Sequence, residues 1–389
     1  MTTLRSTETP DAAELLARAR ALVPSLLERS PRTEAERRVP DETVADFERA
    51  GFFRVLQPKR YGGLQMEFSV FAHLVRELAH GCASSAWVYA VVAELGWVMA
   101  LFPREGQDEI WGSDPSARGC AAVDPSGKAE KVAGGYKLSG QWRFISGSDH
   151  AQWVLLTAPC GEGAARVVRQ FLVRRSEMQA VDDWYVMGLV GTGSRSLTAN
   201  NVFVPDSRSI TQQEMLLGTA PGKDIHPDYP TLRAPRRFLT AFSLCPVIVG
   251  LADRALQIVV DSTRMKLAAG TPIPDLDALQ LKIAESAADI DTVNTLLDTH
   301  LARTVARIAA GEAISDQDVL RNRMRGAYIT RLARTATDRL CVASGSGWIF
   351  DNSPLQVVFR DVTAGATHRA LNFESSAKNY LRALGVGAS

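Results

Sequence analysis

The sequence predicts a mainly helical protein with a small β domain in its middle. Helical apolar periodicity covers residues 1–115, short β-like runs fill residues 116–215, and long helical patterns return over residues 216–389. Strands do not alternate with helices along the chain, so we do not expect a doubly wound parallel sheet. The expected architecture is an N-terminal helical domain, a small β-sandwich or barrel and a C-terminal four-helix bundle.

Four helices are predicted in the first domain, and they span residues 11–29, about 40–51, 67–79 and 84–101. The third carries an apolar stripe with a 3.6-residue period from Phe68 to Leu78. The fourth is apolar almost all round, as expected of a buried helix, and Pro103 ends it.

The central domain contains short strand-like runs at residues 136–140, 153–157, 171–173 and 197–204. Gly134 and Gly135 precede the first run, and this pattern predicts a hairpin turn. Pro205 closes the last run.

The third domain shows the clearest helical pattern, in which apolar residues recur three and four apart from Leu276 to Leu301. Such a narrow apolar seam is typical of helices packed in a bundle. We expect flanking helices at about 239–267 and 316–343, and an irregular, proline-rich connection at 213–236.

Composition narrows the possible functions. The net charge of +1 excludes a global field that favours nucleic acid or an anionic membrane. We find no apolar run of 18 or more residues and no signal peptide. Five scattered cysteines and dispersed histidines favour reduced thiols in a cytoplasmic protein without a metal site. His73 and His80 could share a helix face, but no carboxylate completes a clear metal set with them.

One candidate site segment runs from Gly140 to Trp153 and predicts a strand, a polar turn and a second strand. In an extended chain Trp142, Phe144 and Ser146 share one face. An aromatic surface beside a hydroxyl suits a flat heteroaromatic ring. The other interpretation is a core tryptophan next to a turn.

Two further segments have the composition of ligand-binding loops. In residues 187–196, closely spaced glycines accompany the hydroxyls of Thr192 and Ser194, although an ordinary loop is equally compatible. The third glycine of a dinucleotide-binding motif is missing. Gly345 and Gly347, followed by Arg360, can hold a phosphate through backbone amides and a guanidinium. A helix cap and a structural Arg–Asp pair are the alternative there.

These segments, together with the run from Arg360 to Arg369, resemble the acyl-CoA dehydrogenase superfamily. More narrowly, they resemble its two-component flavin-dependent monooxygenases (group D). That branch includes oxygenases of phenols and steroid-derived aromatics, dibenzothiophene monooxygenases and amino-sugar N-oxygenases. The resemblance extends from Pro58 to about Asn372.

The resemblance implies a role for each candidate residue. Trp142, Phe144 and Ser146 would line the isoalloxazine ring, with Ser146 near its N5 edge, and Thr192 and Ser194 would lie on the flavin or substrate side. The residues implied to contact the flavin phosphate region across a subunit interface are Arg264, Gly345, Gly347 and Gln356. Arg360 is a further candidate for binding the cofactor. Shared cofactor sites imply a homotetramer, or at least a dimer.

His368 and Arg369 occupy the places where many of those dehydrogenases carry a tyrosine and a catalytic glutamate. A permanently charged arginine cannot abstract a substrate proton, and nothing directs Glu285 of the bundle toward a flavin. His368 matches a histidine of the monooxygenase branch, and its ordinary pKa of about 6.5 suits proton transfer near neutral pH. It would either deprotonate the substrate or stabilise and protonate a flavin hydroperoxide. A histidine that caps a helix end is the alternative.

The resemblance therefore implies the oxygenase component of a two-component monooxygenase. It would use FMNH2 or FADH2 from a separate NAD(P)H:flavin reductase, and O2, through a C4a-hydroperoxyflavin. The stretch 94–102 lacks a histidine that phenol-hydroxylating relatives often carry. An aromatic, polyketide or alkaloid-like substrate of secondary metabolism is therefore expected rather than a simple phenol. An acyl-CoA dehydrogenase and a non-catalytic helical scaffold remain the competing hypotheses.

Overall fold

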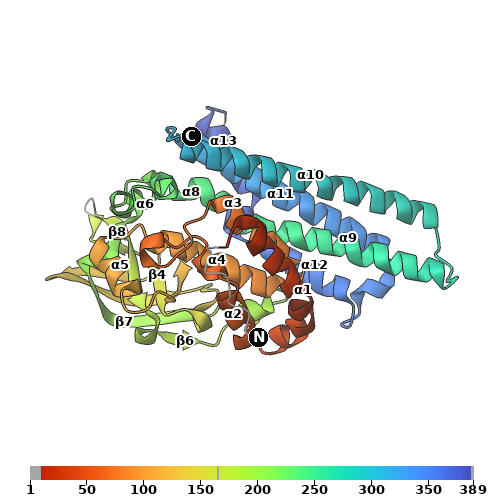
Figure 1. Cartoon of the computed structure of the whole chain (residues 1–389), viewed down its shortest axis with the longest axis horizontal. Helices are drawn as coiled ribbons and strands as arrows, with labels where there is room; N and C mark the ends of the chain where they lie inside the picture. Colours follow the sequence, from red (N-terminus) through yellow and green to blue (C-terminus); the bar gives the residue numbers. More distant parts are fainter. Residues whose placement is uncertain (1–9, 164–165, 387–389) are drawn as a thin grey trace, which may run out of the picture.

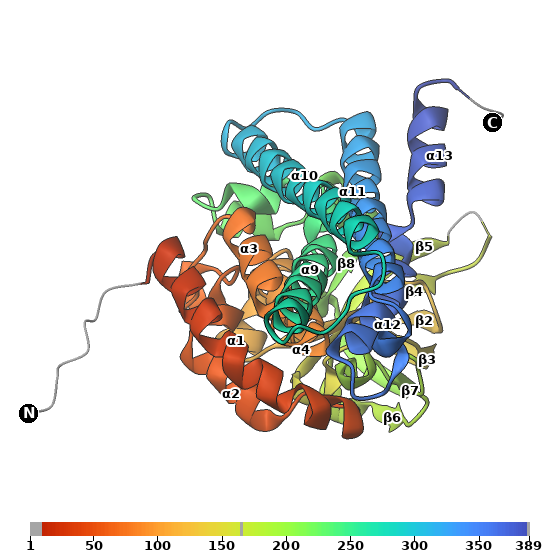
Figure 2. The ribbon, with the colours of Figure 1, turned by 90° about the vertical axis from the view of Figure 1, so that its right-hand side faces the viewer.

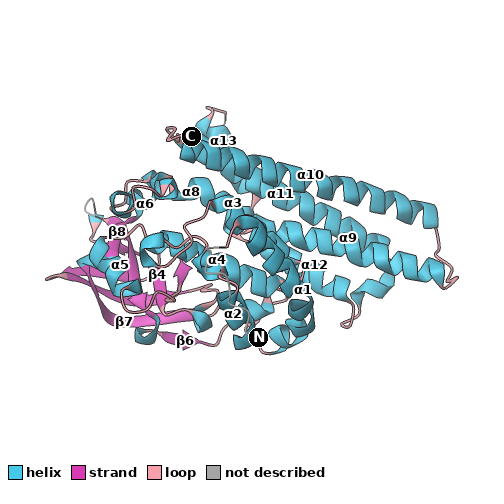
Figure 3. Ribbon diagram, in the orientation of Figure 1, coloured by secondary structure: helices cyan, strands magenta, loops and turns pink. Residues whose placement is uncertain are grey.

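The computed structural model describes residues 10–163 and 166–386. The strands gather at one end of the molecule and long helices extend from the other, with the N-terminal helices between them (Figure 1, Figure 3). The predicted fold class is confirmed. The domain limits at 1–115, 116–215 and 216–389 remain a prediction.

The N-terminal helices are α1 (Ala12–Ala35), α2 (Asp41–Arg49), α3 (Phe68–Ala79), α4 (Ala83–Met99) and α5 (Arg104–Trp111). Asp11 caps the N-terminus of α1, where its carboxylate accepts the backbone N–H of Glu14. Helix α4 is buried on almost every side, as its uniformly apolar sequence predicts. The short helix α5 follows Pro103 and is absent from the sequence prediction, because its eight residues form too short a pattern.

The strands are β1 (Gly119–Ala122), β2 (Lys128–Val132), β3 (Gly135–Trp142), β4 (Trp153–Cys160), β5 (Val167–Arg174), β6 (Gln179–Val181), β7 (Ser196–Pro205) and β8 (Ser209–Thr211). They form one mixed sheet in the order β6-β7-β3-β2-β4-β5-β8, with β1 parallel to β4. The predicted hairpin is confirmed: β2 and β3 are antiparallel, and Gly134 adopts a φ of +74° in the turn between them.

The C-terminal region contains α6 (Gln212–Leu217), α7 (Gly222–Ile225), α8 (Arg236–Leu239), α9 (Cys245–Ala268), α10 (Leu276–Ala309), α11 (Asp316–Ala343), α12 (Pro354–Ala366) and α13 (Phe373–Ala383). The helix predicted at 239–267 is divided by a 3₁₀ turn at Thr240–Phe242, so α9 begins later than expected. The predicted seam of α10 is buried from Ile290 to Leu301, whereas Leu276 and Leu279 are only partly covered.

Residues 236–268 are long and apolar enough to cross a membrane by length and composition. However, 67% of that apolar window is buried inside the protein, where α9 packs against α3, α11 and α12. A core helix accounts for its hydropathy. The five cysteines are all unpaired, and only Cys160 is partly exposed.

Candidate active site

Three segments converge on α4. An added Cβ at Gly147, in the turn after β3, would lie 2.9 Å from Val92 of α4. An added Cβ at Gly365 of α12 would lie 3.4 Å from Trp87 and 3.5 Å from Leu189. These glycines let the turn after β3, the 187–194 loop and α12 approach the helix closely.

Backbone bonds then join the two loops to each other. The N–H of Gly147 donates to the Thr192 carbonyl at 3.2 Å, and that of Ile145 donates to the Arg195 carbonyl at 3.2 Å. The two predicted loop sites, 48 residues apart at Ser146 and Ser194, are therefore one site.

The hydroxyls of Ser146, Ser194 and Thr192 form a buried chain. Ser146 Oγ lies 2.6 Å from Ser194 Oγ, which lies 2.7 Å from Thr192 Oγ1. Thr192 donates its single hydroxyl proton to the Leu189 carbonyl at 2.8 Å. Ser194 must therefore donate to Thr192, and Ser146 to Ser194. The chain has one direction, and Ser146 Oγ is left with free acceptor capacity.

The prediction that Trp142, Phe144 and Ser146 share one face is wrong. Strand β3 ends at Trp142, whose ring is fully buried in the sheet core and whose indole N–H donates to the Thr157 carbonyl at 2.9 Å. Phe144 adopts a φ of +61°, which turns its ring away from that core. Its side chain is 62% exposed and meets Trp184 edge-on, with ring centroids 6.1 Å apart.

His368 lies just after α12, where its imidazole packs edge-on against Trp87 with centroids 5.7 Å apart. Its Nδ1 accepts the backbone N–H of Ala370 at 3.2 Å. The neutral ring consequently carries its proton on Nε2, which acts as a donor.

His368 is exposed to solvent, although its ring packs against Trp87 and lies near Arg369 and Arg323. Loss of hydration in these surroundings, assisted by Arg369 and Arg323, lowers the pKa of His368 to about 4. Arg369 is held by Asp124, with Nη2 and Oδ1 2.5 Å apart. At neutral pH the histidine is therefore neutral.

Arg360 and Asp361 fasten the 187–194 loop to α12. Arg360 donates to the Met187 carbonyl at 2.8 Å, to Gln356 at 2.9 Å and to Glu34 at 3.1 Å. The Asp361 carboxylate accepts the Leu189 N–H at 2.6 Å, and burial raises the pKa of Asp361 to about 7. These contacts give Arg360 and Gln356 a structural task within the chain, and their expected phosphate contact remains a prediction.

Three other predicted residues lie away from this site. Arg264 is near the end of α9, with its side chain 77% exposed and its closest carboxylate Asp261 in the same helix. Gly345 and Gly347 follow α11, and no atom lies within 4 Å of a Cβ added at either. Both segments belong to the helical end of the molecule, which Figure 2 faces.

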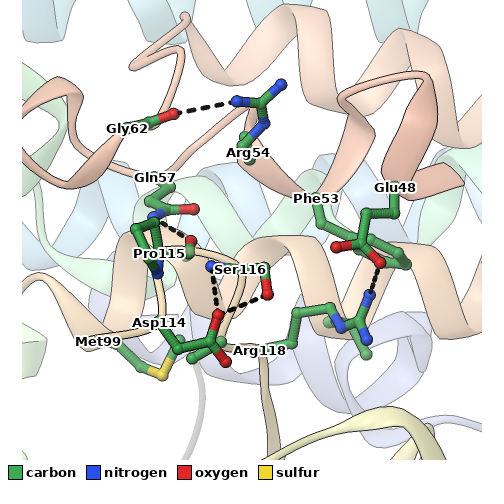
Figure 4. A pocket seen from close by; sticks show the side chains of 13 residues that line it. Glu48, Phe53, Arg54, Gln57, Gly62, Met99, Asp114, Pro115, Ser116 and Arg118 are labelled. Carbon is green, nitrogen blue, oxygen red and sulfur yellow. Dashed lines mark hydrogen bonds and ion pairs between the residues drawn. The ribbon is translucent and has the colours of Figure 1, made fainter. Parts of the chain in front are cut away.

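A separate cavity of about 360 Å³ opens between the N-terminal helices and the segment before β1. Gln57 and Arg118 lie at its wall, Arg118 pairs there with Glu48, and Met99 reaches it from α4 (Figure 4). None of the predicted site residues lines it.

Sequence reasoning missed several neighbours of His368. Trp87 was hidden in the uniformly apolar pattern of α4. Arg323 lies on α11 among other arginines, with no local signal that distinguishes it. Only the fold brings these two residues close to the histidine.

Comparison with known proteins agrees with this architecture. The family profile described as acyl-CoA dehydrogenase, N-terminal domain, matches residues 9–113, and that of the acyl-CoA dehydrogenase C-terminal domain matches residues 242–373. The chain is 36% identical over 94% of both lengths to the oxygenase subunit HsaA of a flavin-dependent monooxygenase from Mycobacterium tuberculosis. It is 29% identical to the oxygenase component of p-hydroxyphenylacetate 3-hydroxylase from Acinetobacter baumannii, over 95% of this chain and 89% of that protein.

Solved structures give the same result. The crystal structure of the HsaA monooxygenase from M. tuberculosis superimposes with a TM-score of 0.91, at 34% identity and over 98% of this chain and 99% of that one. XiaF from Streptomyces, solved in complex with FADH2 and glycerol, superimposes with a TM-score of 0.87 at 25% identity, over 97% of this chain and 96% of that one.

Proposed function

The chain belongs to the acyl-CoA dehydrogenase superfamily and is the oxygenase component of a flavin-dependent monooxygenase, and from this premise we propose how its residues serve that reaction. When bound, reduced flavin supplies the electrons that activate O2. The chain's own part is to hold the ring, to exclude water and to place proton donors and acceptors around it.

The proposed binding of the flavin ring depends on Ser146. The N5 position of a reduced flavin bears a hydrogen, and Ser146 Oγ has acceptor capacity because its own proton is committed to Ser194. The exposed ring of Phe144 offers a stacking surface nearby. We propose that Ser146, Ser194 and Thr192 lie at the N5 edge of the flavin and that Phe144 stacks on one face of its ring. Trp142 lies in the sheet core, and we propose no flavin contact for it.

His368 is the proposed proton-transfer residue. Its neutral imidazole presents Nε2–H, so it would stabilise negative charge that develops on oxygen rather than remove a substrate proton. A dehydrogenase would need a carboxylate at this place. Asp124, a carboxylate that acts on the charge of the histidine, is instead paired with Arg369.

We propose an aromatic substrate, because the related enzymes are named for p-hydroxyphenylacetate and resorcinol hydroxylation. We further propose that a separate reductase supplies the flavin, because the sequence carries no dinucleotide-binding motif. We also propose that the protein is a homotetramer and is located in the cytoplasm. Exposed apolar side chains at the helical end and unpaired, mostly buried thiols support it.

Rapid mixing tests the function. The full-length protein with photoreduced FMN or FAD is mixed with oxygenated buffer in a stopped-flow cell. We expect a transient near-ultraviolet absorbance band that differs from both reduced and oxidised flavin. Single-phase reoxidation without such a band, together with bleaching of protein-bound oxidised flavin by an acyl-CoA, would support a dehydrogenase instead.

A further inference from the structure

We propose that the cavity beside Gln57 is a second small-molecule site, separate from the flavin site, and that it binds a neutral phenol. The cavity of about 360 Å³ lies between the N-terminal helices and the segment before β1. Its volume is in the range of small-molecule sites in proteins. The inference goes beyond the proposed function and does not depend on it, because it requires neither flavin nor oxygen.

The side-chain amide of Gln57 is the central polar group of this cavity. Gln57 is only 3% exposed, and its Nε2 donates to the Tyr61 carbonyl at 2.8 Å and to the Pro115 carbonyl at 2.9 Å. These two bonds fix the orientation of the amide, because a reversed amide would set its oxygen against two carbonyl oxygens. Oε1 must therefore face away from both carbonyls, and in Figure 4 it points into the space between the lining side chains.

The Gln57 Oε1 atom is an acceptor without a partner inside the protein. Among the described residues no donor bonds to it, and the atom keeps some accessible surface. A carbonyl oxygen of this kind accepts a hydrogen bond and cannot give one. The group that fills the cavity should therefore present an O–H or N–H to Gln57.

The inner wall of the cavity is apolar. Phe53, Val92 and Met99 line it and are all buried, and Gly96 contributes no side chain that would fill the space. A phenylalanine ring and a methionine thioether both make favourable contacts with an aromatic ring. An aromatic body with a single donor group matches this wall.

The charged residues of the cavity favour a neutral ligand. Arg118 Nη1 pairs with Glu48 at 3.2 Å. The Asp114 carboxylate accepts the backbone N–H of Ser116 at 3.0 Å and its hydroxyl at 2.6 Å. With Arg54, two positive and two negative side chains lie at the wall, so their charges sum to zero. A phenol, which stays protonated at neutral pH like a tyrosine side chain, meets this condition.

A single side chain separates this cavity from the flavin site. Val92 lines the cavity, and a Cβ added at Gly147, next to Ser146, would lie 2.9 Å from it. His368 instead contacts Trp87, which does not line the cavity. The two sites therefore share helix α4 but use different polar groups, and a phenol in the cavity does not occupy the place of the flavin.

Methyl NMR of the full-length, flavin-free protein tests the site. The matched probes are 4-ethylphenol and its methyl ether, 4-ethylanisole, which lacks the donor. Met99 lines the cavity and reports its occupancy, whereas Met187 belongs to the loop of Thr192 and Ser194 and reports binding at the flavin site. M99L and M187L identify the two signals. We expect 4-ethylphenol to shift the Met99 signal with its own midpoint and to bind at least about 5-fold more tightly than the ether.

Q57L removes the acceptor and should weaken binding of the phenol at Met99 about 5-fold, while binding of the ether changes less than about 2-fold. Q65L is the matched control, because Gln65 bonds to the Lys59 N–H and the Asp228 carbonyl outside the cavity. If Q57L does not fold, S116W gives an independent test. Ser116 is exposed at the wall, and an indole there should fill the cavity and prevent both probes from shifting the Met99 signal.

A Met99 signal that does not move, or that moves only in step with Met187, would overturn the site. Equal affinities for the two probes, a preference for the phenol that survives in Q57L, or undiminished binding in S116W would do the same. Absence of the near-ultraviolet transient in the stopped-flow experiment would instead count against the proposed function, and the flavin-free titrations remain independent of it.

Discussion

Ser146 gives its only hydroxyl proton to Ser194, because Ser194 and Thr192 commit theirs further along the same chain. Ser146 Oγ can therefore accept a hydrogen bond from a donor such as the N5–H of reduced flavin. The N5 of oxidised flavin carries no hydrogen and needs a donor, which Ser146 does not offer. The site should therefore prefer the reduced form of the cofactor.

Replacing this hydroxyl gives the first prediction. S146A should weaken binding of reduced flavin by about 1 kcal/mol, or roughly 5-fold, and change oxidised-flavin binding little. Anaerobic and aerobic fluorescence titrations measure the two dissociation constants. S139A is a suitable control, since Ser139 makes a comparable hydroxyl contact with Asn201 on the exposed sheet. An equal loss for both redox forms would contradict the proposed direction of the chain.

At His368 the structure separates the two roles that the sequence left open. Because Nδ1 is occupied by the Ala370 N–H, the neutral ring donates through Nε2 and has no free lone pair for a substrate proton. A side chain with an N–H donor should therefore replace it better than a carboxylate.

This is the second prediction. H368A should lower the yield of hydroxylated product per reduced flavin by about 100-fold, H368Q should recover part of the yield, and H368E should not. The flavin affinity of all three should stay within about 2-fold of the original. Product analysis with a flavin-reductase supply measures the yield. Recovery by glutamate alone would establish a base and refute the donor role.

At the level of elements, the sequence predicts correctly those features that depend on residues close together along the chain. The stripe of α3, the buried α4 and the β2–β3 hairpin follow from local periodicity and turn chemistry, and all three are present. Phe144 broke the alternation after β3 because a non-glycine residue adopts a positive φ there, which no local propensity indicates. The strand prediction therefore placed Trp142 on the same face as Phe144, whereas the Trp142 ring lies in the sheet core.

The contacts of α12 lead to the third prediction. R360Q removes the hydrogen bonds from α12 to the Met187 carbonyl and to Glu34. The substitution should therefore lower the free energy of unfolding by about 2 kcal/mol. Denaturant titration measures this loss. Reduced FMN and lumiflavin should be affected equally, since Arg360 positions the loop of Thr192 and Ser194. A selective loss of FMN would restore the phosphate role.

At the scale of the whole molecule, the surroundings of His368 could not have been predicted from the sequence. Trp87, Arg323 and His368 come from three separate helical segments, and nothing local distinguishes Arg323 from the other arginines. Their proximity depends on packing in the complete fold.

Buried histidines give the whole chain a pH-dependent stability, which is the fourth prediction. Burial lowers the pKa of His150 and of His300 to about 4, so the unfolded chain binds more protons below the ordinary value of about 6.5. Stability should then fall as the pH decreases from about 6.5 toward 4. Asp361 acts in the opposite sense, because its raised pKa makes its contribution decline as the pH rises through about 7. Thermal unfolding of H150Q and of the unaltered protein compares the acid slopes, and identical slopes would exclude His150 as a contributor.

The helical end of the molecule carries the fifth prediction. Large apolar side chains are exposed there, among them Met265 at 66%, Val342 at 68% and Phe350 at 64%. Such an apolar surface is unusual on a monomer and suits contact with further copies of the chain. A V342E/F350E variant should therefore be a smaller species than the unaltered protein by light scattering.

If Arg264 and the Gly345–Gly347 turn hold phosphate across that interface, the variant should also bind reduced FMN more weakly while lumiflavin binding is unchanged. L217E, which alters an exposed leucine of α6, should keep the original mass. A monomeric unaltered protein, or a double variant with unchanged mass, would contradict an interface at this end.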